Sequence, residues 1–246
     1  MSEPAVTVAL VTGAAGGVGR QVAADLASRG WIVLVPGRSV DVARSLAADL
    51  AGFGDVRALE VDLDVTVPAA VEAVPEAVRA ATGRLDVLVN NTAAFASWNE
   101  LASSAGVAAA RIVMESNDFG PWRLAQILLP LLRESPHPRI VNVSSGGGSC
   151  SDAPTRPTPR RGTAAGHGVS RAALSALTAT LAAELAGSNV LVNAVEPGHT
   201  ATWPGTQQVG APWVLEVAAS VVLAAVLPDG GPSGAFPRDD GELLPW

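Results

Sequence analysis

The chain has 246 residues, which suits one α/β domain of ordinary size, and we expect residues 1–246 to form a single domain. Its 16 Lys and Arg against 23 Asp and Glu give a formal net charge of −7, which argues against a surface that binds the phosphate backbone of DNA or RNA. The single Cys150 excludes an internal disulfide, and Glu3 stands where a secretory signal would carry positive charge. The longest apolar stretch, 217–227, is too short to cross a bilayer. We therefore expect a cytoplasmic protein outside the membrane.

Short apolar runs bounded by turn residues alternate with longer stretches of helical period. The runs predict strands at 6–11, 31–35, 56–61, 85–89, 139–143 and 190–194, each apolar on both faces. The helical stretches predict helices at 17–28, 40–51, 68–81, a long one ending near Leu132, 167–186 and 212–227, and Gly30 suits the left-handed position after the first. This order predicts an α/β, doubly wound parallel sheet with helices on both faces, the single-domain Rossmann arrangement.

Two stretches interrupt the repeat. Residues 146–162 are too rich in Gly, Pro and Ser for regular structure, and we expect a surface loop there. Such a loop is either a lid over a substrate site or a flexible connection without a role. Residues 200–211, with Trp203 and Pro204, also predict a loop.

A glycine-rich turn joins the first strand to the first helix, with the sequence Thr12-Gly13-Ala14-Ala15-Gly16-Gly17-Val18-Gly19. Glycines allow a tight turn and let backbone N–H groups approach a pyrophosphate, and the helix N-terminus adds partial positive charge. An ordinary strand–helix connection is the alternative, but the βα context favours a dinucleotide site.

Several motifs together resemble the short-chain dehydrogenase/reductase family. The turn Thr12-Gly13-x-x-x-Gly17-x-Gly19 is similar to the family's phosphate loop, and Asn117, Ser144-Ser145 and the turn from Asn193 to Gly198 fall where the family has matching residues. The tail 227–246, which ends in Leu-Pro-Trp, is similar to that of the carbonyl reductase-like branch. The resemblance covers nearly the whole chain and implies a nicotinamide dinucleotide cofactor and a small-molecule substrate.

The choice of cofactor is read at the end of the second strand, where an acid would bind the ribose hydroxyls and an arginine a 2′-phosphate. The chain has Pro36-Gly37-Arg38-Ser39 there and no acid until Asp41. Arg38 therefore favours NADP(H), because a guanidinium binds phosphate through two bonds and no carboxylate stands nearby to repel it. A solvated surface arginine is the alternative.

The resemblance also implies the other cofactor residues. Asp62 and Leu63 are expected to contact the adenine, and Asn90 to line the nicotinamide ribose. Pro197 and Gly198 are expected beside the nicotinamide, and Thr202 at its carboxamide or at the pyrophosphate. Residues 90–93 read Asn-Asn-Thr-Ala where the family has Asn-Asn-Ala-Gly, so this chain adds bulk at that turn.

The resemblance assigns four catalytic positions, of which two are altered. Ser145 and Asn117 match the family's serine and asparagine, whereas His167 stands for the tyrosine and Arg171 for the lysine of Tyr-x-x-x-Lys; the chain contains no tyrosine. His167 and Arg171 are one helical turn apart and share a face. Histidine titrates in the physiological range, and Arg171 and an oxidised nicotinamide would disfavour the imidazolium. We expect a neutral imidazole, which can accept a proton or donate a hydrogen bond.

Three functions remain open. The first is an NADP(H)-dependent oxidoreductase acting on the carbonyl or alcohol of a bulky small molecule, with His167 replacing tyrosine. The second is a non-redox isomerase, cyclase or dehydratase on the same scaffold, and the third is a binding protein without turnover. The first is favoured because Ser145, Asn117 and the cofactor residues occur together.

The substrate wall and the oligomeric state are less constrained. An aromatic lining of the site and scattered core packing are both open for the bulky rings of Phe95, Trp98, Trp122, Trp203 and Trp213. The long stretch between Ser145 and His167 resembles the insertion of monomeric carbonyl reductases, so we expect a monomer, with a dimer as the alternative. We expect no metal.

Overall fold

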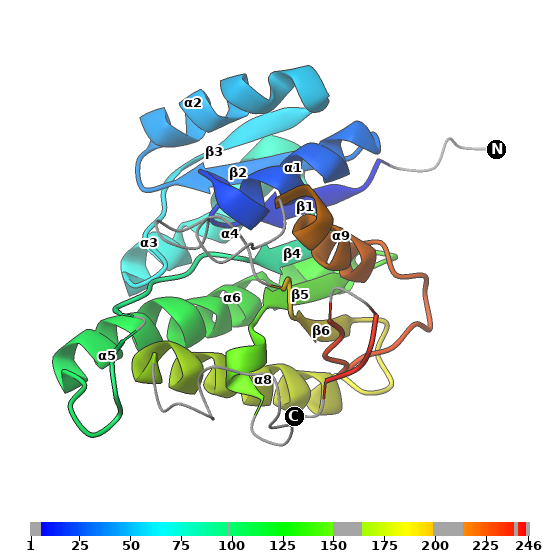
Figure 1. The fold of residues 1–246 in the computed structure, drawn as a ribbon. Helices are drawn as coiled ribbons and strands as arrows, with labels where there is room; N and C mark the ends of the chain where they lie inside the picture. Colours follow the sequence, from blue (N-terminus) through cyan, green and yellow to red (C-terminus); the bar gives the residue numbers. More distant parts are fainter. Residues whose placement is uncertain (1–5, 98, 150–163, 199–213, 239–240, 245–246) are drawn as a thin grey trace.

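A computed structural model of the chain describes residues 6–97, 99–149, 164–198, 214–238 and 241–244. In this part of the chain six parallel strands form one sheet in the order β3-β2-β1-β4-β5-β6 (Figure 1). Their bounds are β1 Val8–Val11, β2 Ile32–Gly37, β3 Val56–Asp62, β4 Val87–Asn90, β5 Arg139–Val143 and β6 Leu191–Val195. The chain reverses its direction of travel across the sheet between β1 and β4, which confirms the doubly wound prediction.

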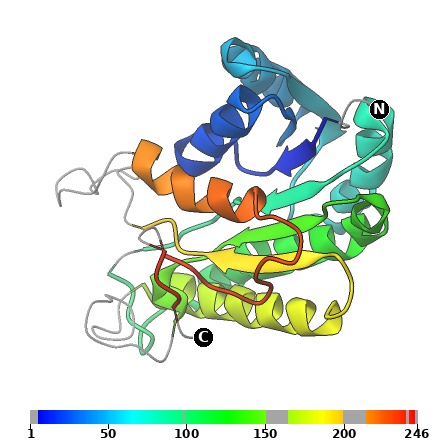
Figure 2. The ribbon, with the colours of Figure 1, turned by 90° about the vertical axis from the view of Figure 1, so that its right-hand side faces the viewer.

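Helices cover both faces of the sheet. One face carries α1 (Gly17–Ser28), α2 (Val40–Leu50) and α9 (Val214–Ala225), and the other carries α4 (Val74–Thr82), α6 (Gly120–Glu134) and α8 (Ala165–Glu184) (Figure 2). Two separate apolar clusters follow, because successive strand residues point to opposite faces: Leu10 and Leu88 pack with Leu128 and Leu174, whereas Val11 and Val89 belong with Val22 and Val221. Each face therefore has its own core.

The predicted helix at 68–81 is wrong in being continuous. The chain forms α3 (Pro68–Glu72) and α4 (Val74–Thr82), with Ala73 between them. Pro75 lies in the first turn of α4, where its missing N–H is tolerated; within one long helix it would remove a hydrogen bond and clash with the preceding turn. Gly83 then ends α4 in the left-handed conformation, with φ 73°, as Gly30 does after α1, with φ 83°.

The predicted long helix ending near Leu132 contains a π-helical turn. α5 (Val107–Met114) continues into this turn at Glu115–Phe119 and then into α6, which ends at Glu134. Pro121 carries no N–H and cannot supply the α-helical bond to the Asn117 carbonyl, whereas Gly120 N bonds to Glu115 O in the wider pattern. The π-helical turn contains Asn117, one of the four catalytic residues that the family resemblance implies.

β3 departs from the prediction that every strand is apolar on both faces. It lies at one end of the sheet, and Arg57, Glu60 and Asp62 are exposed. Glu60 forms an ion pair with Arg44 of α2 at 2.6 Å. Charged side chains are typical of a strand with one free edge.

The other predicted elements differ from the structure mainly at their ends. The part of the 146–162 loop that is described contains a short 3₁₀ turn at Gly146–Gly148, which the prediction of no regular structure missed. The remainder of that loop and the 200–211 loop lie outside the described residues. Beyond α9 the tail runs alongside β6, where Gly234 N bonds to Val192 O at 2.8 Å and Ala194 N to Ala235 O at 3.0 Å. Among the helices described, none has the length and apolar character needed to cross a membrane.

Candidate active site

The predicted site residues gather at the carboxyl ends of the strands. Thr12 follows β1, Asn90 ends β4, and Ser144 and Ser145 follow β5. β1 and β4 are neighbours on either side of the point where the strand order reverses. In open α/β sheets this is where the loops diverge and a ligand crevice forms.

The glycine-rich turn is fastened to the loop after β4. Asn91 Nδ2 donates to the carbonyls of Thr12 at 3.0 Å and Gly13 at 3.2 Å, while Thr12 Oγ1 accepts from the backbone N–H groups of Asn91 and Thr92 at 3.0 and 3.1 Å. A Cβ added to Gly19 would overlap Asn91 Nδ2 and the Gly13 carbonyl. Sequence reasoning found the glycines but missed Asn91, which follows the neighbouring strand β4 and holds the turn through its hydrogen bonds.

The same turn fits a pyrophosphate. Gly13 and Gly17 have φ of 68° and 55°, a conformation that side chains disfavour. Gly16 precedes α1 without a side-chain hydrogen bond, and a Cβ there would meet nothing within 4 Å, so no side chain at Gly16 bonds the N–H groups that the start of a helix leaves unsatisfied. The side chain of Val18 packs against the core cluster, which leaves its backbone for a cofactor.

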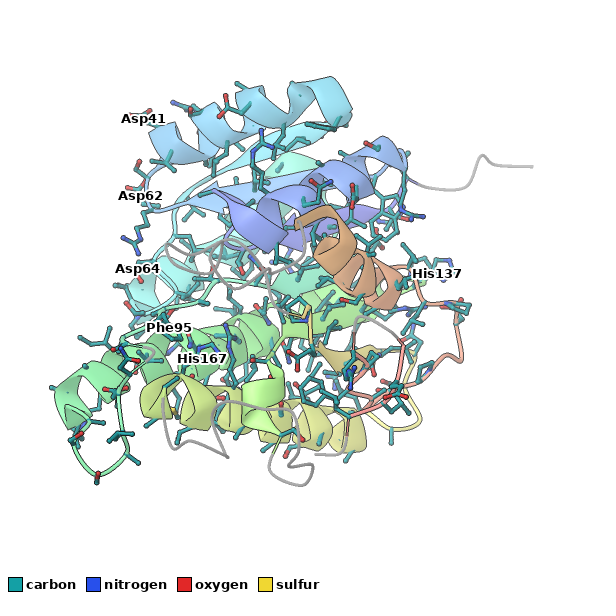
Figure 3. All side chains as sticks on the ribbon, in the orientation of Figure 1. Asp41, Asp62, Asp64, Phe95, His137 and His167 are labelled. Atoms are coloured by element: carbon teal, nitrogen blue, oxygen red, sulfur yellow. The ribbon has the colours of Figure 1, made fainter. Side chains whose placement is uncertain are left out.

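Around Arg38, at the end of β2, the expectation that no carboxylate stands nearby is wrong. A register shift pairs Gly37 with Asp62, whose carboxylate accepts from Val40 N at 2.7 Å at the start of α2. Hydrogen bonds from Thr66 and, to a smaller extent, the charge of Arg38 lower the pKa of Asp64. Figure 3 labels Asp62 and Asp64 at this end of the sheet. The acids come from β3 and its loop, and the sequence around Arg38 does not reveal them.

Two residues expected at the cofactor turn their side chains into the protein. Leu63 is buried in the core, and its N–H donates to Gly37 O at 2.8 Å. Asn90 is 2% exposed, and its Nδ2 donates to Asn142 Oδ1 at 2.9 Å; Asn142 in turn donates to Thr178 Oγ1 of α8 at 2.9 Å. The Leu63 side chain is therefore taken up by the core, and the Asn90 Nδ2 group by Asn142. Among the described residues, Asn90 Oδ1 has no hydrogen-bond partner.

The turn after β6 follows the carboxyl end of that strand. Pro197 and Gly198 are half-buried, and Gly198 has φ 78°. Asn193, earlier in this motif, instead fastens the tail, because its amide bonds to Pro232 O at 2.8 Å and to Ala235 N at 2.9 Å. Thr202 lies outside the described residues.

Asn117 sits fully buried in the π-helical turn and clamps two segments. Its Oδ1 accepts from Ala94 N at 2.7 Å, and its Nδ2 donates to Ala94 O and to Ser170 Oγ, both at 3.0 Å. The Ser170 hydroxyl in turn donates a hydrogen bond to the backbone carbonyl of His167 at 2.8 Å. The Asn117 amide thus joins the loop after β4 to the second turn of α8, and Ser170 is a second residue that sequence reasoning missed.

Ser144 and Ser145 have different surroundings. Ser144 is buried, and its Oγ bonds to Arg171 O at 3.2 Å and to Ser175 Oγ at 3.0 Å, which attaches the end of β5 to α8. Ser145 is half-buried, and its Oγ accepts from Gly147 N at 3.2 Å in the 3₁₀ turn. A hydroxyl oxygen that accepts this bond keeps its hydrogen to donate, as a group that holds a substrate oxygen must.

His167 lies in the first turn of α8, half-buried, with the ring of Phe95 at a centroid distance of 5.0 Å (Figure 3). Burial, and then the charge of Arg171, lower the pKa of His167 from 6.5 to about 3. The imidazole is therefore neutral at physiological pH, as the sequence predicted.

Arg171 follows one turn later and is 4% exposed. Its guanidinium donates to Val143 O, the last carbonyl of β5, at 2.9 Å, and burial lowers the Arg171 pKa to about 10. Among the described residues, Arg171 Nε has no hydrogen-bond partner. The group stays protonated at neutral pH and places a positive charge near His167.

Two of the bulky rings left open between an aromatic lining and core packing, Phe95 and Trp122, are among the described residues. Phe95 contacts His167, whereas Trp122 of α6 stacks on Phe119 of the π-helical turn with centroids 6.5 Å apart, and both of these rings are 40% exposed. Trp98, Trp203 and Trp213 lie outside the described residues. Across the part of the chain that the structure describes, no cluster of three or more His, Cys, Asp or Glu side chains is placed to hold a metal ion.

Comparison with known proteins gives consistent matches. A family model described as short chain dehydrogenase matches residues 7–209. The (-)-isopiperitenone reductase of Mentha piperita is 32% identical over 309 aligned positions, which cover 96% of this chain and 98% of the relative. A rhamnolipids biosynthesis 3-oxoacyl-(acyl-carrier-protein) reductase of Pseudomonas aeruginosa is 33% identical over 196 positions, covering 78% and 72%.

Solved structures agree over nearly the whole length. L-Sorbose reductase from Gluconobacter frateurii, complexed with NADPH and L-sorbose, has a TM-score of 0.81 at 27% identity, and the match covers 98% of this chain and 97% of that one. The Pseudomonas aeruginosa RhlG complex with NADP has a TM-score of 0.78 at 28% identity, covering 96% and 95%.

Proposed function

The chain belongs to the short-chain dehydrogenase family, and from this premise we propose that it is an NADP(H)-dependent oxidoreductase acting on the carbonyl or alcohol of a bulky small molecule. Relatives over most of the chain are named as reductases, and two similar structures are described as complexes with NADPH or NADP. The reduced nicotinamide, when bound, supplies the hydride for such a reaction.

The residues that would hold the cofactor run along the crevice. The backbone of the turn from Thr12 to Gly19 would bind the pyrophosphate, with Asn91 keeping that turn rigid. Arg38 would bind the 2′-phosphate through its guanidinium. Asp62 and Asp64 offset part of this attraction, so we expect a preference for NADP(H) that is narrower than an isolated arginine would give.

The observation that supports the proposal most is the hydrogen-bonded group formed by Asn117, Ser170 and the backbone carbonyl of His167. It fixes the start of α8, the helix that carries His167 and Arg171, against the loop after β4. A helix start held in this manner can keep the side chains that it carries in position to orient a carbonyl for hydride transfer.

We assign His167 the role of a neutral hydrogen-bond donor. Its depressed pKa excludes the imidazolium as the resting form, but a neutral ring N–H can polarise a carbonyl and stabilise the negative charge that develops on its oxygen. The Ser145 hydroxyl would donate to the same oxygen, and the buried charge of Arg171 would favour the alkoxide. Water would supply the proton that completes the alcohol.

A protein that binds the cofactor without redox turnover is the second candidate. The observation in its favour is that the Arg171 guanidinium is engaged by Val143 O, since this bond competes with any grip on the cofactor ribose. A non-redox catalyst using His167 as a base is disfavoured, because a group with a pKa of about 3 is a weak base at neutral pH.

Binding and turnover can be separated in one experiment. NADPH and NADP⁺ are titrated by fluorescence, and a panel of aromatic and polycyclic ketones is then added while the absorbance of the reduced nicotinamide is followed. Binding followed by ketone-dependent oxidation supports the oxidoreductase. Binding without oxidation supports the second candidate, and failure to bind contradicts the cofactor assignment.

A further inference from the structure

The first turn of α8 is capped by a residue from a distant segment. The N-terminal flanking residue of the helix, Ala164, has φ 53° and provides no side-chain cap. Glu100 supplies two acceptors instead: its backbone carbonyl accepts from Ala165 N and its Oε2 from Gly166 N, both at 3.2 Å. Two of the four N–H groups that a helix start leaves unsatisfied are thus bonded by one residue, and its carboxylate also suits the positive end of the helix.

The contact between Glu100 and Gly166 restricts which residue can stand at position 166. A Cβ added to Gly166 would lie 3.1 Å from Glu100 Oε2 and 3.6 Å from Ala110 Cα on α5. Gly166 is buried, and Ala164 is 1% exposed despite its left-handed backbone. A non-glycine residue in that conformation persists only where its surroundings fix it. The capping carboxylate is therefore part of a packed junction.

Glu100 belongs to the same segment as Phe95, whose ring packs on His167. We define this strap as residues 94–97 and 99–100. Asn117 holds one end through the N–H and the carbonyl of Ala94, and Glu100 holds the other end on α8. Between these two fixed points the ring of Phe95 packs on the imidazole of His167 at 5.0 Å, tilted by 52°.

We propose that Glu100 is a positioning residue for His167: by capping α8 it holds the strap over the imidazole and keeps that ring shielded from water in its neutral form. The role of Glu100 in turnover rests on the proposed oxidoreductase function. The effect of Glu100 on the surroundings of His167 is independent of that function.

The charges around His167 make this effect measurable. Ionisable groups on the described elements packed near it are Arg171 on its own helix, Glu100 on the strap, and Arg111, Glu115 and Asp118 on α5 and the π-helical turn. Burial is the main cause of the low His167 pKa and Arg171 the second. Release of the strap removes the burial, so the pKa should rise toward 6.5 even though Arg171 stays in place.

The test is an NMR titration of the histidine ring protons. The chain has three histidines, and the His167 signal is assigned from its loss in His167→Gln. Glu100→Ala removes the side-chain acceptor, Glu100→Asp keeps the charge but shortens its reach, and Glu100→Gln keeps an oxygen acceptor without charge. Glu184→Ala is the matched control, because it removes a carboxylate from the exposed last turn of the same helix.

We expect the His167 signal of the unaltered chain, Glu100→Gln and Glu184→Ala to stay constant from about pH 5 to 8. In Glu100→Ala and Glu100→Asp it should titrate within that range, and kcat for ketone reduction should fall by about tenfold or more while NADPH affinity is retained. Rescue of both properties in Glu100→Gln identifies the hydrogen bond as the cause.

A His167 signal that stays constant in both Glu100→Ala and Glu100→Asp would overturn the proposal, whether or not the protein turns over a ketone. A signal that titrates in these variants of a protein without turnover would support the strap and contradict the oxidoreductase function. The two ideas can therefore fail separately.

Discussion

The two sides of the crevice are built in different ways. On the side of β1 and α1, the groups that would face a cofactor are backbone N–H groups in a turn of small residues, fastened by Thr12 and Asn91. On the side of α8, the reacting groups are side chains, and their surroundings set their protonation: His167 is kept neutral, and Arg171 stays charged in a buried position.

This difference bears on how each side would respond to substitution. A backbone turn depends on the absence of side chains, so nearly every substitution breaks it. A side-chain site needs a donor, a charge and fixed positions, and more than one residue type can meet those needs. We propose that His167 and Arg171, which the sequence resemblance places at the family's tyrosine and lysine positions, fall on the tolerant side.

The largest effect is expected from the α8 side. His167→Ala should lower ketone turnover by about a hundredfold to a thousandfold, the range for loss of a hydrogen-bond donor that stabilises a developing oxyanion, with NADPH affinity retained. Stopped-flow absorbance and fluorescence titration measure the two quantities separately. His167→Tyr alone should not restore ordinary ketone reduction, because Arg171 is not lysine; full reductase activity in that variant would show that the surroundings contribute less than we infer.

A change on the backbone side should act on binding instead. Gly19→Ala forces a Cβ against Asn91 Nδ2 and the Gly13 carbonyl, so unfolding free energy should fall by about 1–3 kcal/mol and NADPH binding should be lost. Gly52→Ala is the matched control, because a Cβ there meets nothing within 4 Å. Thermal denaturation and fluorescence titration of both variants provide the check, and normal NADPH binding by Gly19→Ala would contradict the rigid turn.

Arg38 tests cofactor choice on the same side. Arg38→Ala should weaken the binding of NADPH by about tenfold to a hundredfold, as expected when hydrogen bonds to a charged group are lost, and it should leave the binding of NADH nearly unchanged. Asp64→Asn should tighten the binding of NADPH slightly, because it removes a negative charge that interacts with Arg38, as the lowered pKa of Asp64 indicates. Titrations with both cofactors measure this, with the exposed Arg29→Ala as control. Equal losses for NADPH and NADH would exclude a 2′-phosphate contact.

The smallest expected effect is on acid stability. The folded pKa of His167, about 3, lies below its ordinary 6.5, so between these values the unfolded chain binds a proton that the folded chain does not. Stability should therefore fall as pH drops through 6.5, by at most about 1.4 kcal/mol per pH unit from this group. Urea unfolding at pH 7.5 and 5 should show a smaller loss for His167→Gln than for the unaltered chain; an equal loss would mean that His167 is not buried in neutral form.

The sequence predicted what local pattern determines. The alternation of strands and helices, α1 from Gly17 to Ser28 and the glycine turn all depend on periodicity and on residues next to one another. It failed where distant residues meet: Glu100 reaches Gly166 across 66 positions and Asn91 reaches Thr12 across 79. The inward turn of Asn90 and the acids beside Arg38 also depend on neighbouring strands, which a single chain pattern does not reveal.

The most direct test of the account is the pH dependence of kcat/KM for NADPH-dependent ketone reduction, which reports the ionisations of the free enzyme. Because His167 titrates at about 3 and Arg171 at about 10, we predict a constant value from about pH 5 to 9. A kcat/KM that falls as pH rises through 6.5 would mean that an imidazolium delivers the proton, and it would contradict a neutral His167 as the donor.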